Sequence, residues 1–282
     1  MFARLEHRVH STAGATKRAR EVDVIGSKER FSDRVADYVR YRPGYPQPLI
    51  DLLRVECGVG PGAFVADVGS GTGILTRSLL ATGAHVAAIE PNAEMRLAAE
   101  RDLAAEARFR SIDASAEATT LATGSVDVVI AAQAFHWFDS PRARAEFARI
   151  LRRGGWVALV WNDRKDSPFN RDYEDMLERF APAYAAVRAR ERAAHENMET
   201  FFAPEPPKRT TFANEQQLDE LGLLGRLESS SYVPRPGQPG HDAVAARARE
   251  IYHAHQRDGG VTLAYETVVW YGRLSSQAVA HG

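Results

Sequence analysis

The chain has 282 residues, of which 44% are hydrophobic, and this length suits one large domain or a core domain with a smaller cap. Lysine and arginine total 36 against 37 aspartate and glutamate residues, so the net charge of −1 argues against nucleic acid as the main partner. The single cysteine, Cys57, excludes an intramolecular disulfide and a multi-cysteine zinc site, and it fits a reducing, cytoplasmic setting.

Residues 1–27 carry no pattern of a folded element, and we expect a flexible tail there. Basic residues mix in this segment with serine, threonine and glycine, without the apolar centre of a secretory signal. An organelle presequence is the alternative, weakened by the acidic residues Glu6, Glu21 and Asp23. No stretch of the chain approaches the roughly 18–20 apolar residues that span a bilayer, so we expect no membrane association.

Folded structure is predicted from residue 31 onward. Helical spacing of apolar residues predicts helices over 31–41 and 48–55, separated by the Arg-Pro-Gly-Tyr-Pro run at 42–46. Short β-rich runs then alternate with helices, which is typical of a parallel sheet with right-handed crossovers. The predicted strands are 64–68, 84–89, 107–112, 126–131 and 156–161, and the predicted helices between them are 74–81, 92–105 and 141–151, the last ended by glycines 154 and 155.

The pattern changes after residue 162. We predict one charged, alanine-rich helix over 171–200, breakers at 203–207 and 234–240, an amphipathic helix over 242–256 and a strand over 262–271. The expected fold class is α/β: a Rossmann-like, doubly wound, mostly parallel seven-stranded sheet with an antiparallel final strand and a helical cap insertion. The predicted parts are the tail (1–27), a cofactor-binding core (28–163), the helical cap (164–204) and the remainder of the core with the final strands (205–282).

A glycine-rich turn, Asp-Val-Gly-Ser-Gly-Thr-Gly at 67–73, follows the first predicted strand. Glycines let a ligand approach the backbone closely, and doubly wound sheets bind ligands at this carboxyl edge. A dinucleotide fingerprint needs G-x-G-x-x-G, but Ile74 stands where its third glycine belongs. Asp67 would repel a pyrophosphate and attract the cationic groups of S-adenosyl-L-methionine (AdoMet), so AdoMet is favoured over a dinucleotide or a purely structural turn. The predicted cofactor contacts here are Asp67, Gly69, Ser70, Gly71, Thr72 and Gly73.

This turn resembles motif I of class I AdoMet-dependent methyltransferases, and the resemblance extends over about residues 31–275. The Ile-Glu-Pro-Asn run at 89–92 is similar to the family's second motif. The resemblance implies that Glu90 accepts hydrogen bonds from both ribose hydroxyls, with Pro91 and Met95 also at the cofactor. The alternative for Glu90 is an acid stabilised by the dipole of the following helix.

The Ser-Ala-Glu run at 115–117 resembles the family's adenine-edge motif, although Thr120 stands where proline is usual. The resemblance implies that the backbone amide of Ala116 meets the adenine ring, with Asp113 as the alternative partner of its amino group. An ordinary loop role is the other interpretation of both residues. The predicted cofactor contacts of this segment are Asp113, Ser115, Ala116 and Glu117.

The run Ala-Ala-Gln-Ala-Phe-His-Trp-Phe-Asp at 131–139 follows the fourth predicted strand. It resembles the corresponding motif of a subgroup that includes trans-aconitate methyltransferase relatives, and residues 31–46 and 224–232 strengthen that match. Gln133 is predicted at the cofactor, and His136, Trp137 and Phe138 at the substrate. His136 is the candidate catalytic base, because imidazole accepts a proton near neutral pH, and a packed histidine is the alternative.

Three residues near the start of the folded chain complete the predicted site. Tyr38 and Arg42 are expected over the AdoMet carboxylate, which the arginine fork suits, and Tyr45 at the substrate. His253 and His255 face different directions on a helix, so we predict no metal. The expected function is methyl transfer to a small-molecule acceptor, with a carboxylate or hydroxyl oxygen favoured. N- or C-methylation and a non-catalytic AdoMet-binding partner protein are the alternatives, and a homodimer is left open.

Overall fold

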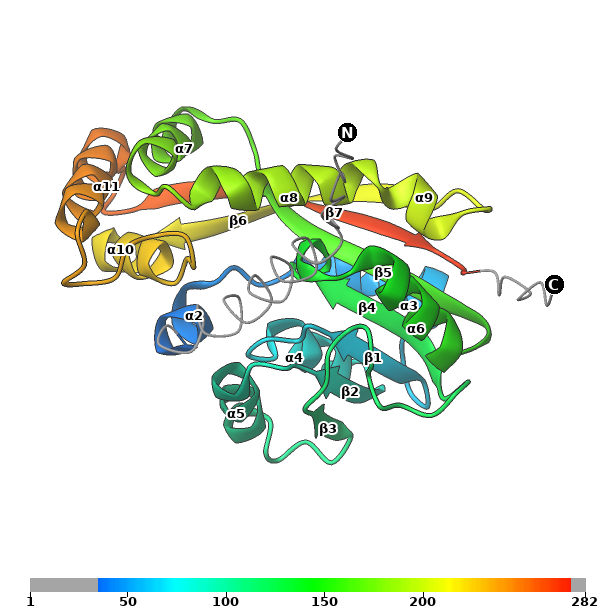
Figure 1. The fold of residues 1–282 in the computed structure, drawn as a ribbon. Coiled ribbons are helices and arrows are strands. Elements are labelled where there is room, and N and C mark those ends of the chain that lie inside the picture. Colours follow the sequence, from blue (N-terminus) through cyan, green and yellow to red (C-terminus); the bar gives the residue numbers. More distant parts are fainter. Residues whose placement is uncertain (1–34, 275–282) are drawn as a thin grey trace, which may run out of the picture.

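A seven-stranded sheet forms the centre of the computed structural model, which describes residues 35–274 (Figure 1). The strand order is β3-β2-β1-β4-β5-β7-β6. β1 to β5 pair in parallel, β7 runs antiparallel to β5, and β6 runs antiparallel to β7. The strands are β1 Phe64–Val68, β2 His85–Ile89, β3 Phe109–Ile112, β4 Val126–Ala132, β5 Leu151–Arg164, β6 Lys208–Leu218 and β7 Val261–Gly272. The predicted fold class is confirmed, whereas the tail at 1–27 and the start of the helix at 31–41 lie outside the described residues.

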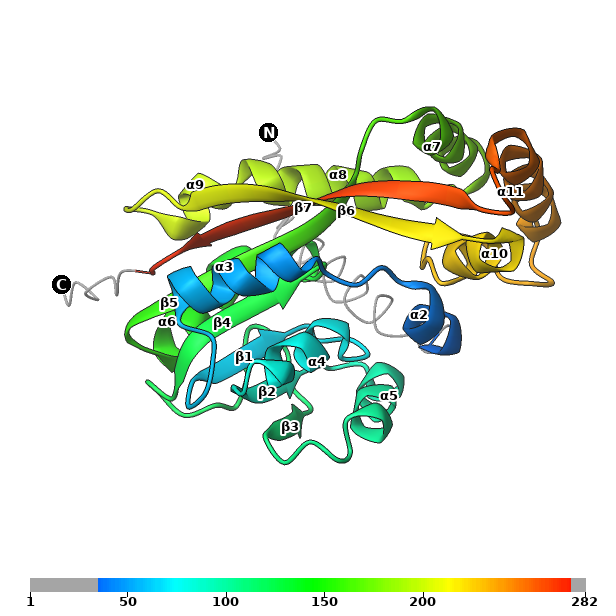
Figure 2. The same cartoon turned by 180° about the vertical axis from the view of Figure 1, so that it is seen from behind.

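Helices cover both faces of this sheet (Figures 1 and 2). The helices are α2 Val35–Tyr41, α3 Gln47–Cys57, α4 Ile74–Ala81, α5 Ala93–Asp102, α6 Ser140–Ile150, α7 Pro168–Phe180, α8 Tyr184–Glu196, α9 Met198–Phe202, α10 Glu220–Glu228 and α11 His241–His255, and a short 3-10 helix, η1, spans Phe135–Trp137. One apolar cluster joins α3 and α4 to the sheet, and another joins α6, α8 and α9 to its other face. Because both faces are covered, the central strands are almost continuously apolar.

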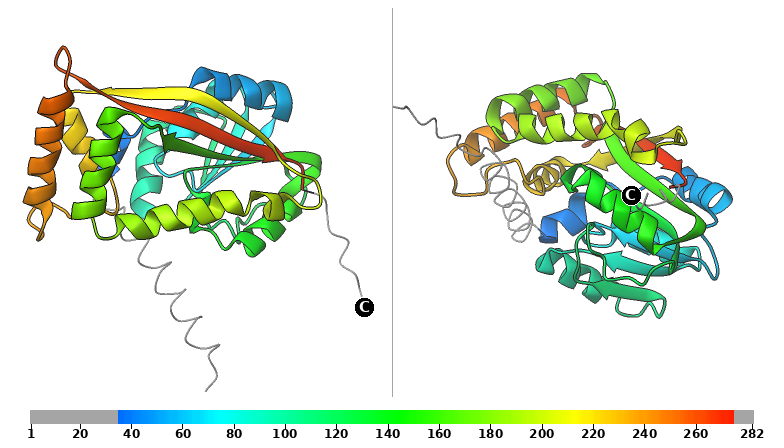
Figure 3. Two further views of the ribbon diagram at one scale, coloured as in Figure 1. Left: turned by 90° about the horizontal axis from the view of Figure 1, so that it is seen from above. Right: turned by 45° about the vertical axis from the view of Figure 1, so that its right-hand side comes forward.

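A third apolar cluster lies at the far ends of β6 and β7, where α7, α10 and α11 pack together (Figure 3). The range predicted as a helical cap, 164–204, holds α7, α8 and α9. α10 and α11 lie in the chain between β6 and β7, and α10 packs against α2 so closely that the ring of Tyr41 occupies the space of a side chain at Gly225. The helices that pack together at this end of the sheet, α7, α10 and α11, therefore come from segments distant in sequence.

Two local predictions are wrong, and one strand was not predicted. The helix predicted over 171–200 is three helices, because the segment holding Pro182, which lacks a backbone N–H, separates α7 from α8. Glycines 154 and 155 do not end α6, which stops at Ile150, but lie inside β5. A Cβ on Gly155 would be 2.8 Å from the carbonyl oxygen of Asp127, so a side chain does not fit there. β6 had no predicted position, because its side chains are mostly polar, as an edge strand with one neighbour allows.

Candidate active site

The glycine turn joins the end of β1 to the start of α4. Gly69 has φ 71°, and a Cβ placed on it would lie 2.5 Å from the Cβ of Ala134, so the loop after β4 packs directly on this turn. The backbone N–H groups of Gly69 and Ser70 donate to the carbonyl of Ile89 at 2.8 and 3.1 Å. The carboxyl ends of β1, β2 and β4 are thereby held around one point.

Two buried carboxylates flank the turn. Asp67 accepts a hydrogen bond of 2.6 Å from the Thr76 hydroxyl, and burial raises the pKa of Asp67 to about 6, aided by the charge of Glu90 and opposed by the Thr76 bond. Glu90 accepts from the N–H of Gly71 at 2.9 Å and from the N–H of Asn92 at 2.8 Å. These two bonds fix the Glu90 carboxylate beside the glycine turn.

A cavity opens above this turn, and we call it the glycine-loop cavity. The predicted cofactor residues that line it are Tyr38, Asp67, Gly69, Ser70, Gly71, Thr72, Glu90, Pro91, Met95 and Gln133. Three residues predicted at the substrate, Tyr45, Trp137 and Phe138, also line it. Sequence reasoning missed the lining residues Ile74, Leu75, Asn92, Ala132 and Ala134, although all of them adjoin the motifs it used.

The residues predicted around the adenine do not line this cavity, and neither does Gly73. Asp113 forms an ion pair of 3.0 Å with Arg96, and Glu117 accepts from the N–H of Asp139 at 2.9 Å. Ser115 forms a β-bridge with Ala118, and Ala116 is buried in the core. The adenine contacts of Asp113, Ser115, Ala116 and Glu117 therefore stay predictions.

A second cavity adjoins the first at Tyr38, Gln133 and Trp137, which line both. Gln133 sits at their junction with φ 56°, a left-handed conformation that is uncommon outside glycine and clusters at functional sites. Four arginines line the second cavity, so we call it the arginine cavity: Arg42, Arg164, Arg188 and Arg226. Tyr184, Tyr232 and Tyr265 also line it.

His136 lines the arginine cavity from η1. Its ring is half-buried, and its Nδ1 atom is buried without a hydrogen-bond partner. Burial lowers the pKa of His136 to about 4, with Arg190 and His195 contributing in the same direction and Glu191 opposing them. The imidazole is therefore neutral at pH 7, and its Nδ1 has no hydrogen-bond partner within the described part of the chain.

Arg42, predicted over the AdoMet carboxylate, lines the arginine cavity and not the glycine-loop cavity. Its Nη2 donates to the carbonyl of Ser229 at 2.9 Å, and its guanidinium lies 4.6 Å from the centre of the Tyr38 ring. Tyr38 itself lines both cavities, so the predicted contact of Arg42 with the cofactor stays a prediction.

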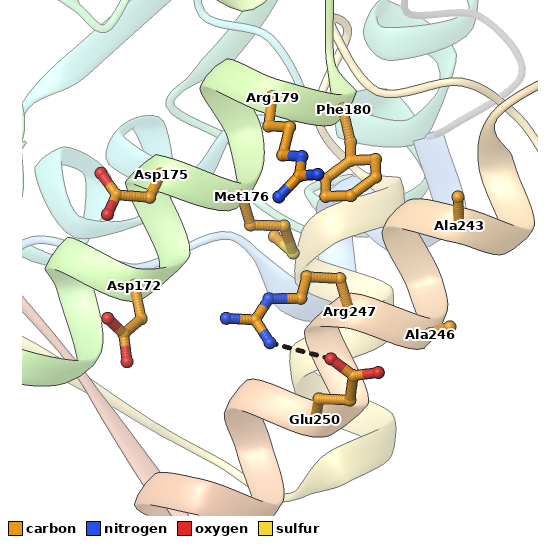
Figure 4. A pocket seen from close by; sticks show the side chains of 9 residues that line it. All are labelled: Asp172, Asp175, Met176, Arg179, Phe180, Ala243, Ala246, Arg247 and Glu250. Atoms are coloured by element: carbon orange, nitrogen blue, oxygen red, sulfur yellow. Dashed lines mark hydrogen bonds and ion pairs between the residues drawn. The ribbon is translucent and has the colours of Figure 1, made fainter.

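Another groove, of about 590 Å³, lies elsewhere, between α7 and α11 (Figure 4). Arg247 and Glu250 form an ion pair of 2.8 Å within it, and no residue of the glycine turn lines it.

Among residues 35–274, no three potential metal ligands gather, and His255 contacts Asp172 at 2.6 Å. No helix within that range is long and apolar enough to cross a membrane. The candidate active site is therefore the pair of cavities at the glycine turn.

Known proteins resemble this chain in its central part. Residues 66–159 match the methyltransferase domain family. An uncharacterised methyltransferase of Mycobacterium tuberculosis is 43% identical over 138 residues, which cover 48% of this chain and 53% of that protein. A methyltransferase-like protein of Schizosaccharomyces pombe is 32% identical over 164 residues, covering 55% and 62%. The chain thus spans between half and two thirds of the length of these relatives.

Solved structures share the fold over a larger part of the chain. A proposed type II methyltransferase from Anaeromyxobacter dehalogenans is 27% identical with a TM-score of 0.59, covering 83% of this chain and 98% of that one. A phosphoethanolamine N-methyltransferase of Haemonchus contortus, 14% identical with a TM-score of 0.50 over 86% of this chain and 57% of its own, shares the fold alone. Residues 66–159 are thus a methyltransferase domain, and the glycine turn with its two acids and the shared fold make the chain similar to class I AdoMet-dependent methyltransferases.

Proposed function

We propose that this protein transfers the methyl group of AdoMet to an oxygen atom of a small molecule. The observation that carries the proposal is the arginine cavity, which meets the glycine-loop cavity at Tyr38, Gln133 and Trp137. The space inside it is about 80 Å³, against about 140 Å³ in the glycine-loop cavity, so it is the smaller of the two. A small acceptor, or the reacting part of a larger one, is consistent with this difference.

The charge of the arginine cavity supports oxygen over nitrogen as the methyl acceptor. Four arginines line it against one acid, Glu191, and that acid is already paired with Arg188 at 3.0 Å. A simple amine enters a cavity at neutral pH as an ammonium ion, which these guanidinium groups repel. An acceptor molecule that carries an anionic oxygen is attracted by the same charges, more strongly than in water because the surroundings are partly dehydrated, and a neutral hydroxyl group on it is not repelled.

AdoMet supplies, when bound, a methyl group on a positively charged sulfur. Asp67 and Glu90 provide the negative charge that holds such a cation at the glycine turn, and Trp137 lies between the two cavities. The chain's remaining task is to align the acceptor oxygen with the methyl carbon and to exclude water. A carboxylate acceptor needs no base, whereas a hydroxyl proton would pass to the neutral imidazole of His136, which lines the arginine cavity.

The test combines calorimetry with detection of S-adenosylhomocysteine. We expect AdoMet to bind the wild-type protein and to yield S-adenosylhomocysteine with members of a panel of small carboxylic acids and hydroxyl compounds. The Gly71→Val variant should bind AdoMet poorly, because φ at Gly71 is 57° and a β-branched side chain is strained there. Methylation confined to amines or carbon acids would overturn the oxygen assignment, and AdoMet binding without turnover of any acceptor would favour a non-catalytic role.

A further inference from the structure

Three arginines from distant segments converge on the arginine cavity. Arg42 follows α2, Arg164 ends β5, and Arg226 lies in α10. Arg226 is 4% exposed, and the side chain of Arg164 is 9% exposed. Buried guanidinium groups normally have carboxylate partners, because an uncompensated buried charge is costly.

These three arginines are short of negative partners. Arg164 donates through Nε to Glu174 at 3.1 Å, and through Nη2 to the hydroxyl of Tyr184. Arg42 donates to the carbonyl of Ser229, and Arg226 donates to hydroxyl groups, so both have only neutral partners among residues 35–274. Among the described residues, Glu174 is thus the one carboxylate that pairs with any of these three guanidinium groups.

Two of the guanidinium nitrogens have no hydrogen-bond partner at all within the described part of the chain. They are Nη1 of Arg164 and Nε of Arg42, and both are buried. An N–H group in that position loses its hydration without compensation unless a ligand accepts from it. An oxyanion supplies several acceptor lone pairs and matches the fork of a guanidinium.

Tyr232 lines the arginine cavity together with these arginines. Burial alone would raise the pKa of the Tyr232 hydroxyl, yet its pKa is lowered because the charges of Arg164, Arg226 and Arg42 outweigh that effect. Burial lowers the pKa of Arg42, and the charge of Arg226 lowers it further, so these two guanidinium groups repel each other. Negative charge entering the cavity would relieve this repulsion.

We infer that the arginine cavity binds an oxyanion group of the acceptor molecule through Arg42, Arg164 and Arg226, and that this group is distinct from the atom that is methylated. The inference rests on the proposed function and narrows its acceptor to a molecule that carries a carboxylate, phosphate or sulfate as a binding handle. Charge-assisted hydrogen bonds stabilise an oxyanion and make it a poorer nucleophile, and methylation would remove the charge that the arginines bind. The methylated atom therefore lies toward Trp137 and Gln133, where the two cavities meet.

The first experiment measures anion binding without any knowledge of the acceptor. The full chain is titrated with phosphate, sulfate and malonate at constant ionic strength, with and without S-adenosylhomocysteine, and the melting temperature is followed. We expect at least one of these anions to stabilise the protein saturably and sodium chloride not to do so. The ranking of malonate, whose two carboxylate groups are each planar, against the tetrahedral phosphate and sulfate ions identifies the chemistry of the handle. No anion effect in a protein that binds AdoMet normally would overturn the inference while leaving the proposed function intact.

Variants then connect that binding to the arginines. Arg164→Gln and Arg226→Gln should each weaken the affinity for the stabilising anion at least tenfold, while AdoMet affinity changes less than twofold. Arg247→Gln is the matched control, because Arg247 is an exposed arginine of α11 outside both cavities. Unchanged anion affinity in folded Arg164→Gln would refute the inference, and the wild-type titration decides it where a variant fails to fold.

Turnover gives a separate readout. Once an acceptor is found, its analogue without the anionic group should show a KM at least tenfold higher, with the same atom methylated. Arg164→Lys should recover part of the wild-type KM, because it retains the charge and loses the fork. Equal KM values for the two acceptors would exclude the anionic handle even though the protein is a functioning methyltransferase.

Discussion

Replacing Asp67 by asparagine should stabilise the protein without cofactor and weaken its affinity for AdoMet. The carboxylate is 1% exposed, and burial raises its pKa from 3.8 to about 6. A raised pKa of an acid means that the folded state binds the proton more tightly than the unfolded state. Ionisation of Asp67 therefore lowers the free energy of unfolding. This loss is absent below about pH 4 and complete above about pH 6. At 1.36 kcal/mol per pKa unit, the cost at pH 7 is roughly 3 kcal/mol.

Asparagine has nearly the same shape, and its side-chain oxygen can still accept the hydrogen bond from Thr76. We therefore expect Asp67→Asn to raise the free energy of unfolding at pH 7 by up to roughly 3 kcal/mol, measured by urea denaturation. The gain should disappear as the pH falls from about 6 to about 4, because the wild-type carboxyl is then protonated as well.

Cofactor affinity should change in the opposite direction. The positive charge of AdoMet favours the ionised carboxylate, so binding to the wild type should release a proton near pH 5 and weaken about tenfold between pH 7 and pH 5. Calorimetry in buffers of different ionisation enthalpy counts that proton. Asp67→Asn should bind weakly at every pH in this range. A wild-type affinity that is flat between pH 5 and pH 7, or a variant that binds as tightly as the wild type, would refute this reasoning.

Three further predictions concern single residues. Gly69→Ala should lower the free energy of unfolding by about 1–3 kcal/mol because its Cβ clashes with Ala134. Gly62→Ala is the control for backbone strain alone, since Gly62 has φ 82° and open space around it. Equal losses of stability in the two variants would exclude the clash. His136→Gln should slow methylation of a hydroxyl acceptor about 10²–10⁴-fold and of a carboxylate little, and wild-type rates should show no histidine titration near pH 6.5 since its pKa is about 4. Hydrogen bonds from Arg149 and Thr119 lower the pKa of Glu146 to about 2, so its ionised form should stabilise the wild type fully above about pH 4.5. The denaturation curves of Glu146→Gln and the wild type should therefore differ at neutral pH and converge by about pH 2. A difference that does not depend on pH would contradict this.

Local features of the chain were predictable where local chemistry decides them. β1 and α4 have the predicted bounds, 64–68 and 74–81, because a run of buried apolar residues, a glycine turn and a helical repeat follow one another there. The sequence also indicated AdoMet, because Asp67 and the three spaced glycines all lie within the seven residues 67–73. β6 had no such signal, since an edge strand is stabilised by pairing with β7 and not by its own pattern.

The arginine cavity could not be read from the sequence, because its parts are remote along the chain and ordinary when taken singly. Arg164 and Arg226 resemble surface arginines in the sequence, and Arg42 was predicted at the AdoMet carboxylate; the sheet and the packing of α10 against α2 bring the three together. The electrostatic environment of a side chain depends on burial and on neighbours in space, neither of which periodicity contains. Motif chemistry along the chain thus identified the methyl donor, whereas the charge that would select the acceptor arises only from long-range packing.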